Sequence, residues 1–276
     1  MTLTPHPEVV NRQPHVLIVG FGHVGQQIAR YFTEARYVDL DGVVRRAFDG
    51  VEADHEESRF DLGFICVPTP EGEDGACDTS MVRAAFDKWK FAATYWCIKS
   101  TVPIGTTDAL NASYIVPICC FSPEYYGETL GHPLAGVSRD TFVILGGPRE
   151  VTRHFARAWT LVTNSYTRIY QTDARTAELC KLMENSWIAT KVSFCNQFFD
   201  LAAVAGVDWY ELRELWLADP RVSRSHTYVY PRNRGWAGKC LPKDTANLCH
   251  WARGEGQPAE FMEMVRAYNA KLRGGE

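Results

Sequence analysis

The chain has 276 residues, more than one compact core usually holds, so its length favours a nucleotide-binding domain with a smaller second domain. Its net charge of -4 gives no basic field, which argues against nucleic acid or an anionic membrane as a main partner. Nine cysteines without a C-x-x-C pair or a Cys/His metal spacing fit a reducing cytoplasm and indicate no metal site. The sequence shows neither a secretory signal nor a membrane-spanning run, so we expect a soluble protein.

From His15 onward, short β-branched runs alternate with helical patterns, which is typical of a parallel sheet with helical crossovers. The pattern predicts an α/β fold in which residues 1–170 form a Rossmann-type, doubly wound parallel sheet. The expected strands are residues 15–19, 37–44, 62–67, 95–100, 115–121 and 141–145, and the expected helices are residues 23–35, 80–90, 106–112 and 151–162.

Residues 174–205 contain neither glycine nor proline, which predicts one helix about 48 Å long. Thr172 or Asp173 is a candidate N-cap for this helix. Because such a rod is longer than an ordinary crossover, we expect residues 171–206 to link two domains and to carry part of a homodimer interface. Residues 207–276 then form a small all-α domain, with helices expected at residues 208–218, 245–253 and 259–272.

A glycine pattern, Gly20-Phe21-Gly22-His23-Val24-Gly25, lies between the first expected strand and the first expected helix. There the first glycine allows a tight turn, the second lets the backbone approach a pyrophosphate, and the third allows close helix–strand packing. The pattern predicts a dinucleotide cofactor, with a plain glycine-rich turn as the structural alternative. Asp39 and Asp41 both qualify as the ribose ligand expected about 20 positions on; Asp39 is preferred, and either favours NAD over NADP.

Three further polar segments follow expected strands, at the carboxyl edge where open α/β sheets bind ligands. Each also has a structural explanation, because proline ends strands and Ser or Thr caps helices. The segments are Cys66-Val67-Pro68-Thr69-Pro70, Lys99-Ser100-Thr101-Val102-Pro103 and Ser122-Pro123-Glu124-Tyr125-Tyr126-Gly127-Glu128.

Cys240 lies between Lys239 and Lys243, just ahead of an expected helix. Ammonium groups and a helix N-terminus both favour the thiolate, so this cysteine has the setting of a nucleophile. Asp244 follows as a candidate to orient water or to cap the helix. A hydride-accepting cofactor beside a nucleophilic thiol indicates oxidation through a covalent adduct.

Lys181 and Asn185 lie four residues apart on the long helix and therefore share a face. A cation and an amide directed at one point can stabilise an oxyanion. The alternative is a solvated lysine and an asparagine on the helix surface, and spacing alone favours that alternative.

Together these motifs resemble the UDP-glucose/GDP-mannose dehydrogenase family. The resemblance covers nearly the whole chain, because several separate motifs occur in the family's order. They are the Gly20 pattern, Val67-Pro68-Thr69-Pro70, Lys99-Ser100-Thr101-Val102-Pro103, Ser122-Pro123-Glu124, Ala177-Glu178-Leu179-Cys180-Lys181 followed by Asn185, and Gly238-Lys239-Cys240-Leu241-Pro242-Lys243-Asp244.

The resemblance implies an NAD-dependent, four-electron oxidation of a nucleotide sugar, of the kind that makes uronic acids for polysaccharides. Cys240 would form a thiohemiacetal and then a thioester, while Lys181 and Asn185 stabilise the oxyanion. Asp244 and Glu124 would assist proton transfer and water attack, and Thr101 would position water. The implied cofactor contacts are Gly20, Phe21, Gly22, His23, Val24, Gly25, Asp39, Val67, Pro68, Thr69, Ser100, Thr101 and Lys243. The implied substrate contacts are Glu124, Tyr125, Tyr126, Glu128, Lys181, Asn185, Tyr228, Tyr230, Arg232, Gly235 and Trp236.

The sequence also departs from the family pattern. Family members usually carry a third, nucleotide-binding domain after the cysteine domain, and the sequence has no room for it after that domain. A separate chain could supply it, or the loop before Cys240 could hold a pyrophosphate and base with its guanidinium and phenol groups, namely those of Arg221, Arg224, Arg232, Arg234, Tyr228 and Tyr230.

Two other functions remain open at this stage. A two-electron β-hydroxyacid dehydrogenase of the 6-phosphogluconate type also places Lys and Asn four apart on a long helix, but it needs no thiol. A module that binds NAD without turnover would have no need of Cys240, Lys181 and Asn185 together. We therefore expect oxidation of UDP-glucose to UDP-glucuronate, or of a related nucleotide sugar.

Overall fold

The computed structural model describes residues 13–53, 59–125 and 142–274. Contacts divide the chain into two compact units. The first unit comprises Met1–Thr69 and Thr79–Leu179, and the second unit comprises Pro70–Asp78 and Cys180–Glu276. A short segment from the middle of the nucleotide domain thus belongs with the C-terminal part of the chain, which the sequence pattern did not indicate.

One eight-stranded sheet forms the centre of the first unit. Its strands are β1 (Val16–Val19), β2 (Arg36–Val38), β3 (Val44–Arg46), β4 (Phe60–Ile65), β5 (Ala93–Ile98), β6 (Cys119–Phe121), β7 (Phe142–Gly146) and β8 (Arg168–Thr172). They follow the order β3-β2-β1-β4-β5-β6-β7-β8, and the run from β2 to β6 is parallel. The strand β3 is antiparallel to β2, β7 is antiparallel to β6, and β8 is parallel to β7. The strand order reverses beside β1, which creates the switch point where such sheets bind ligands.

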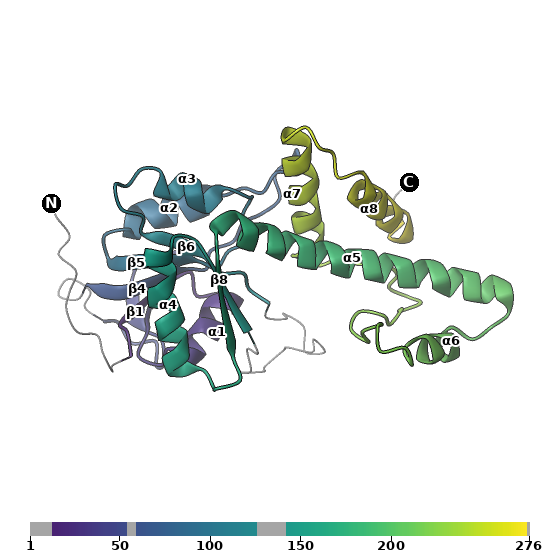
Figure 1. Ribbon diagram of the computed structural model, residues 1–276, viewed down its shortest axis with the longest axis horizontal. Helices are drawn as coiled ribbons and strands as arrows, with labels where there is room; N and C mark the ends of the chain where they lie inside the picture. Colours follow the sequence, from purple (N-terminus) through teal and green to yellow (C-terminus); the bar gives the residue numbers. More distant parts are fainter. Residues whose placement is uncertain (1–12, 54–58, 126–141, 275–276) are drawn as a thin grey trace. The chain divides into compact units, whose positions relative to one another are not determined.

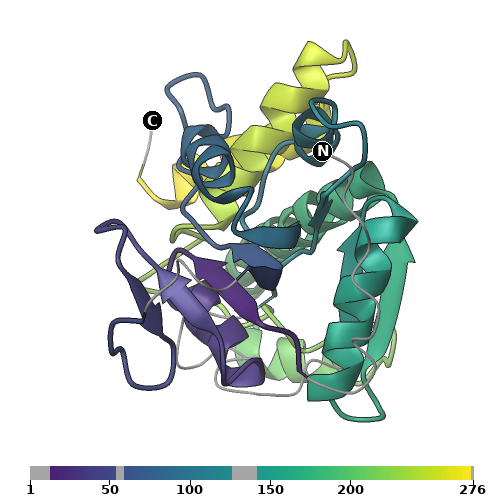
Figure 2. The same ribbon diagram turned by 90° about the vertical axis from the view of Figure 1, so that its left-hand side faces the viewer.

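Helices cover both faces of this sheet (Figure 2). They are α1 (His23–Tyr31), α2 (Ser80–Trp89), α3 (Thr106–Asn111) and α4 (Arg149–Val162). On one face, Ile28 of α1 and Phe155 of α4 belong to one buried apolar cluster. On the other face, Phe86 of α2 and Leu110 of α3 belong to a second cluster. The expected Rossmann-type, doubly wound fold is therefore confirmed.

The long helix α5 (Ala174–Ala205) is continuous, as expected from the sequence (Figure 1). At its start, the Asp173 carboxylate accepts hydrogen bonds from the Thr176 backbone N–H at 2.8 Å and from the Thr176 hydroxyl at 2.6 Å. Asp173 is thus the capping residue of the two candidates. At its end, Gly206 has a φ of 71°, a left-handed conformation that glycine adopts without strain.

The second unit adds three helices, α6 (Trp209–Trp216), α7 (Leu241–Gly254) and α8 (Glu260–Leu272). Two small clusters hold them against α5: Cys249 and Met262 pack with Ala189, and Trp209 packs with Cys195. The part of this unit that the structure describes contains no named strand, so the expectation of an all-α second region agrees with it.

One expected strand was wrong, and one strand was missed. The predicted strand over residues 37–44 is instead a turn between two short antiparallel strands, because Asp41 accepts a hydrogen bond from the Val43 N–H and Gly42 takes a φ of 73°. The strand β8 was missed, because its alternate residues are partly exposed and polar and give little apolar signal.

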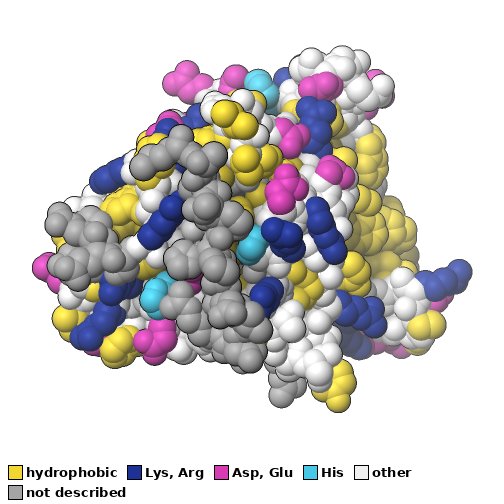
Figure 3. Space-filling model, turned by 60° about the vertical axis from the view of Figure 1, so that its left-hand side comes forward, with side chains coloured by type: hydrophobic (Ala, Val, Ile, Leu, Met, Phe, Trp, Pro, Cys, Tyr) yellow, Lys and Arg dark blue, Asp and Glu magenta, His cyan; other side chains and the backbone are white. Residues whose placement is uncertain are grey.

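The described surface carries no obvious large patch of one charge on the side that Figure 3 shows, where basic and acidic side chains are interspersed. This mixture agrees with the small net charge of the sequence. Among the described residues, no helix combines the length and apolar character needed to cross a membrane.

Candidate active site

The glycine pattern forms a tight turn between β1 and α1. Gly20 has a φ of 90°, and its N–H donates to the Val38 carbonyl oxygen at 2.9 Å. A Cβ atom on Gly25 would lie 2.2 Å from the Gly20 carbonyl oxygen, so only glycine allows α1 to start this close to the turn. A Cβ atom on Gly22 would meet nothing within 4 Å. The backbone is therefore open at the one glycine where a pyrophosphate must approach it, and the turn fits a dinucleotide.

The two candidate ribose ligands have different surroundings. Asp39 directly follows β2 at the carboxyl edge of the sheet, is exposed, and accepts a hydrogen bond only from the adjacent Leu40 N–H among the bonds found for its side chain. Asp41 forms an ion pair with Arg45 at 2.7 Å, and this bond holds the pKa of the Asp41 carboxyl below its usual value. Asp39 has the carboxylate at the strand end, which supports the sequence preference for it.

Two loops at the same edge of the sheet are tied together by hydroxyl groups. Ser100 donates to the Val67 carbonyl oxygen at 2.6 Å, and Thr69 donates to the Thr101 carbonyl oxygen at 2.8 Å. The predicted contact segment 67–69 after β4 and the residues that follow β5 are therefore neighbours. The hydroxyls of Ser100 and Thr69 hold the two loops together, and the loop backbones form the surface beside the glycine turn.

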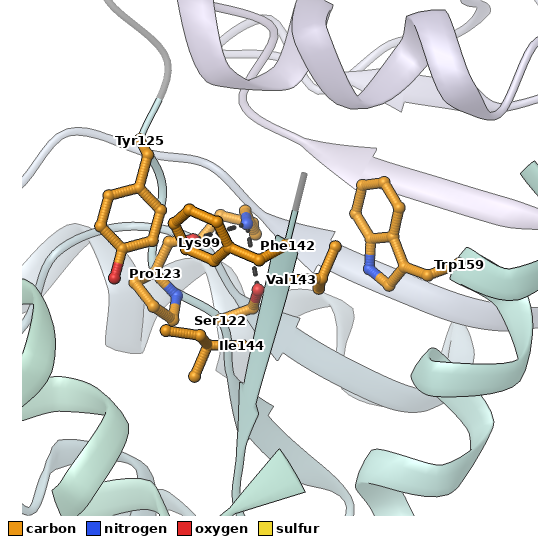
Figure 4. A pocket seen from close by; sticks show the side chains of 8 residues that line it. All are labelled: Lys99, Ser122, Pro123, Tyr125, Phe142, Val143, Ile144 and Trp159. Atoms are coloured by element: carbon orange, nitrogen blue, oxygen red, sulfur yellow. Dashed lines mark hydrogen bonds between the residues drawn. The ribbon is translucent and has the colours of Figure 1, made fainter. Parts of the chain in front are cut away.

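Lys99 links the strand ends of β5 and β6, a role that the sequence motif did not reveal. Its buried ammonium group donates to the Ser122 hydroxyl and to the Pro123 carbonyl oxygen, both at 3.1 Å (Figure 4). These bonds fix the backbone directly before Glu124, one of the predicted catalytic residues. Tyr125 lines a small cavity together with Lys99, Ser122 and Pro123. The predicted contacts Tyr126 and Glu128 lie outside the described residues.

Cys240 is the helix cap of α7, since the helix begins at Leu241 with Pro242 in its first turn. All nine cysteines lie in the described residues, and Cys240 is the one that is exposed. Burial raises the pKa of the Cys66 thiol and of the Cys249 thiol above their usual value. From the sequence we expected this helix to begin at residue 245, whereas it begins at Leu241. The thiol therefore lies closer to a helix N-terminus than expected.

A chain of buried polar side chains follows Cys240 in the second unit. Asp244 is 1% exposed, and its N–H donates to the Cys240 carbonyl oxygen at 2.9 Å. One of its carboxylate oxygens accepts from the Asn185 amide and the other from the Lys243 ammonium group, each at 2.5 Å. Lys181, one turn before Asn185 on α5, is also buried. The structure thus brings Asn185 and Asp244, which are far apart in the sequence, into direct contact.

This contact shows whether Asn185 lies on the helix surface or in a buried network. The asparagine is buried and hydrogen-bonded to a carboxylate, so the interpretation as a surface residue was wrong. Lys243 was predicted to contact the cofactor, and its ammonium group pairs with Asp244. The cofactor role of Lys243 stays a prediction.

The loop before Cys240 is held by side chains that the sequence analysis missed. Asn269 of α8 accepts from the Trp236 N–H and donates to the Trp236 carbonyl oxygen, at 2.8 and 2.9 Å. The Trp236 indole N–H donates to the Ser193 hydroxyl at 2.9 Å. Arg266 of α8 donates to the Pro242 carbonyl oxygen at 2.7 Å. A buried asparagine on a helix with apolar neighbours was the available signal for Asn269, and no local signal identified Arg266.

The predicted substrate contacts in this loop therefore differ in accessibility. Gly235 and Trp236 are partly or fully buried, so their side of the loop offers backbone rather than the indole ring. Tyr228 and Tyr230 are 47% and 61% exposed, and their ring centroids are 4.9 Å apart. Arg232 is exposed. These contacts stay predictions.

Three of the four arginines in the loop are occupied by carboxylates. Arg221 pairs with Asp219 at 2.5 Å, Arg224 with Glu214 at 2.5 Å, and Arg234 with Asp200 at 2.9 Å. The loop is therefore less cationic than its sequence indicates. A substrate pyrophosphate would have to compete with these carboxylates for three of the guanidinium groups.

Comparison with known proteins identifies the family of both parts of the chain. Residues 39–117 match the NAD binding domain of the UDP-glucose/GDP-mannose dehydrogenase family, and residues 175–271 match its central domain. The two matches together cover more than half of the chain. The second match contains Lys181, Asn185, Cys240 and Asp244, whereas the glycine turn precedes the first match and rests on its geometry.

Several curated relatives carry names of nucleotide-sugar dehydrogenases. UDP-glucose 6-dehydrogenase of Pseudomonas aeruginosa is 29% identical over 222 residues, which are 75% of this chain and 48% of that protein. UDP-glucose 6-dehydrogenase of Rhizobium meliloti is 30% identical, over 76% of this chain and 50% of that protein. UDP-N-acetyl-D-mannosamine dehydrogenase of Methanocaldococcus jannaschii is 28% identical, over 75% and 49%. The chain spans about half the length of the curated relatives it matches.

Solved structures support the fold. A UDP-glucose dehydrogenase from Pyrobaculum islandicum superimposes with a TM-score of 0.80 at 24% identity, over 98% of this chain and 70% of that chain. A 3-hydroxyisobutyrate dehydrogenase from Mycobacterium tuberculosis gives a TM-score of 0.72 at 16% identity, over 94% of each chain. With both of its domain types matched in order along the sequence, the chain belongs to the UDP-glucose/GDP-mannose dehydrogenase family, and its cofactor is NAD.

Proposed function

We propose that the protein oxidises the C6 alcohol of a nucleotide sugar to a carboxylate, with two NAD reduced per sugar and Cys240 as the nucleophile. The observation that carries this proposal is the arrangement around α7. Cys240 occupies the N-cap position of α7 and is exposed, and one turn further on the buried side chains of Asn185 and Asp244 form a hydrogen-bonded chain with the partly buried Lys243. A β-hydroxyacid dehydrogenase needs no such thiol, whereas a four-electron oxidation needs a covalent intermediate between its two hydride transfers.

Each protein group has a definite task in this reaction. NAD, when bound at the glycine turn, supplies the hydride acceptor. Cys240 adds to the intermediate aldehyde and converts it into a thiohemiacetal, from which loss of the second hydride gives a thioester. Lys181 and Asn185 stabilise the negative oxygen in these steps, because both are buried and a cation acts more strongly away from water. Asp244 receives the proton of the water that hydrolyses the thioester.

The residues of the first unit contribute binding and orientation. Asp39 would hold the cofactor ribose, and the loop backbones at residues 67–69 and 100–101 would contact the cofactor. Glu124 assists proton transfer, and Thr101 positions water near the cofactor. Lys99 fixes the backbone on which Glu124 depends, through its bonds to Ser122 and Pro123.

The substrate that we favour is UDP-glucose, since several curated relatives bear the name UDP-glucose 6-dehydrogenase. UDP-N-acetylmannosamine is the next candidate, because a relative of similar identity carries that name. Tyr228, Tyr230 and Arg232 offer two exposed rings and a guanidinium group for the base and pyrophosphate.

The test is to incubate the purified protein with NAD and each of UDP-glucose, UDP-N-acetylmannosamine and GDP-mannose, and to count NADH per sugar consumed. Two equivalents support the proposal, and none from any of the three contradicts it. Cys240→Ser should lower the rate of acid formation by at least about 10³-fold. Cys249→Ser, on the same helix but in the apolar cluster, is the control and should retain activity.

The second candidate is a two-electron β-hydroxyacid dehydrogenase. It is favoured by Lys181 and Asn185, which lie four residues apart on α5, because this class of enzyme also places Lys and Asn four apart on a long helix. This candidate predicts one NADH per substrate and full activity in Cys240→Ser. The same stoichiometry experiment, with 3-hydroxyisobutyrate and 6-phosphogluconate added to the panel, distinguishes the two functions.

We also infer that the protein is a homodimer through α5. Seven large apolar side chains on this helix are at least 39% exposed, and at 100° per residue five of them fall within one stripe about 60° wide. An apolar stripe of this length is unfavourable in water and fits an interface with a second copy. Sedimentation should give a dimer at micromolar concentration, and a monomer there contradicts the inference. The five residues are Met183, Trp187, Phe194, Phe198 and Leu201.

A further inference from the structure

Asn247 is a buried polar residue in the second unit with an unsatisfied donor. It lies on α7, one turn after Asp244, and is 1% exposed. Its Nδ2 atom has no hydrogen-bond partner among the described groups. A buried amide donor left unpaired is costly, so such an atom in a native fold calls for a structural or functional reason.

The position of Asn247 on the helix gives a direction for this donor. Asp244 faces α5, since its carboxylate bonds to Asn185. Ala246 faces the segment Pro70–Asp78, because a Cβ on Gly75 would lie 3.6 Å from the Ala246 Cβ. At 100° per residue, Asn247 points between these two directions, 60° from Asp244. The unpaired donor is therefore on the same side of α7 as the carboxylate that follows Cys240.

We propose that Asn247 is a positioning residue for the water that hydrolyses the Cys240 thioester. This proposal rests on the proposed function and adds a residue to its last step. The Asn247 amide donates to the water oxygen, and the water donates to the Asp244 carboxylate. Each Asp244 oxygen already accepts one bond, from Asn185 or from Lys243, and a carboxylate has about four acceptor sites, so a further donor fits.

The step balances without a further reactant. The water oxygen bonds to the acyl carbon while one of its protons passes to Asp244. The tetrahedral intermediate then collapses, the carbon–sulfur bond breaks, and Cys240 leaves as the thiolate. The product is the carboxylic acid, which ionises at neutral pH, and the proton on Asp244 returns to solvent. No electron is transferred, because both hydride transfers precede this step.

This role gives a clear signature when the donor is removed. In Asn247→Leu, the side chain has nearly the same volume but no donor. Both hydride transfers should proceed, so the variant should release a burst of two NADH per Cys240 and then slow by about tenfold or more. Intact-protein mass spectrometry of quenched samples should show the acyl adduct accumulating on Cys240. Asn247→Ser, which keeps a donor, should restore part of the steady rate.

A purely structural asparagine predicts the opposite pattern. Replacing an unsatisfied donor with an apolar group of similar shape is neutral or stabilising. In that case Asn247→Leu would melt at the same or a higher temperature and turn over like the wild type, with no adduct. That result overturns the proposal. Asn247→Ala, which also lacks the donor and is smaller, provides the same comparison should the leucine variant fail to fold.

Two controls keep this inference separate from the proposed function. Cys249→Ala, on the same helix in the apolar cluster, should lower the melting temperature without adduct accumulation. Wild-type protein that forms no NADH from any nucleotide sugar overturns the proposed function itself. Wild-type protein that forms two NADH, alongside an Asn247→Leu variant with equal turnover, overturns only the role of Asn247.

Discussion

The two units build their parts of the site in different ways. In the first unit the surface beside the glycine turn is made mainly of backbone, and Ser100 and Thr69 support it by donating to carbonyl oxygens. In the second unit the site is built from side chains, because the buried Asn185 and Asp244 form a hydrogen-bonded chain with the partly buried Lys243.

This difference decides how each unit should respond to substitution. A binding surface made of backbone requires open space for the ligand, so an added methyl group can block the ligand without disturbing the fold elsewhere. A buried side-chain network depends on every member, since removal of one leaves the others without partners. Substitutions within this hydrogen-bonded network should therefore cost stability and activity together, and well-chosen ones in the first unit should cost cofactor affinity alone.

Asp244→Ala tests the second half of this comparison and should have the largest effect on stability. It leaves the Asn185 amide and the Lys243 ammonium group without their acceptor. Because Asp244 is fully buried, the free energy of unfolding should fall by about 3 kcal/mol, at the lower end for a broken buried pair, since Lys243 is near the surface. Thermal and urea unfolding measure the change. NAD affinity that falls as much as stability would contradict the separation of the two units.

Gly22→Ala tests the expectation for the first unit, namely a loss of cofactor affinity without a loss of stability. The added methyl meets no protein atom within 4 Å, and the φ of Gly22 is -72°, which any residue adopts, so stability should be unchanged. The methyl would occupy the space next to the pyrophosphate, and loss of one or two backbone bonds to phosphate should weaken NAD binding by roughly 10- to 100-fold. Calorimetric titration gives the affinity. Gly254→Ala, also without close neighbours, is the matched control and should bind NAD normally.

The first unit was the more predictable from sequence, for a physical reason. Glycine spacing and alternating apolar runs report local backbone geometry, and the turn between β1 and α1 is local. The misses there were β8 and the short hairpin at Asp41 and Gly42. Both depend on partners or turn residues that an apolar pattern does not register.

The second unit was predictable only in part. The long helix and its Asp173 cap followed from composition and local capping rules. The contact between Asn185 and Asp244 joins residues 59 positions apart, and spacing alone had favoured a position on the helix surface for Asn185. Their spacing made both residues candidates and the family resemblance gave them roles, but their hydrogen bond, and the role of Asn269 in holding the Trp236 loop, became evident from the fold.

Asp39→Ala compares two carboxylates within the first unit. Loss of a charged acceptor for the ribose hydroxyls should weaken NAD binding by about tenfold, with little change in stability because Asp39 is exposed. Asp41→Ala removes the partner of Arg45 instead, and should leave NAD affinity within about twofold, since an exposed ion pair contributes little. Equal losses of NAD affinity in the two variants would show that neither carboxylate alone is the ribose ligand. A larger loss in Asp41→Ala than in Asp39→Ala would identify Asp41 as the ribose ligand.

Asp173→Ala and Asp208→Ala compare one helix cap in each unit and should have the smallest effects. The Asp173 carboxylate accepts a hydrogen bond from the Thr176 backbone N–H, and the Asp208 carboxylate accepts one from the Glu211 backbone N–H, each at 2.8 Å. Each variant should therefore lose about 1 kcal/mol of unfolding free energy at pH 7.

Hydrogen bonds from Thr176 lower the pKa of Asp173 in the folded state. A lowered carboxyl pKa stabilises the fold above the unfolded value of about 3.9, and this contribution disappears as the pH falls through the folded pKa. The difference between wild type and Asp173→Ala should therefore be constant from about pH 6 to 8 and shrink below about pH 4. A difference that grew on acidification would show that the Asp173 carboxylate does not cap α5.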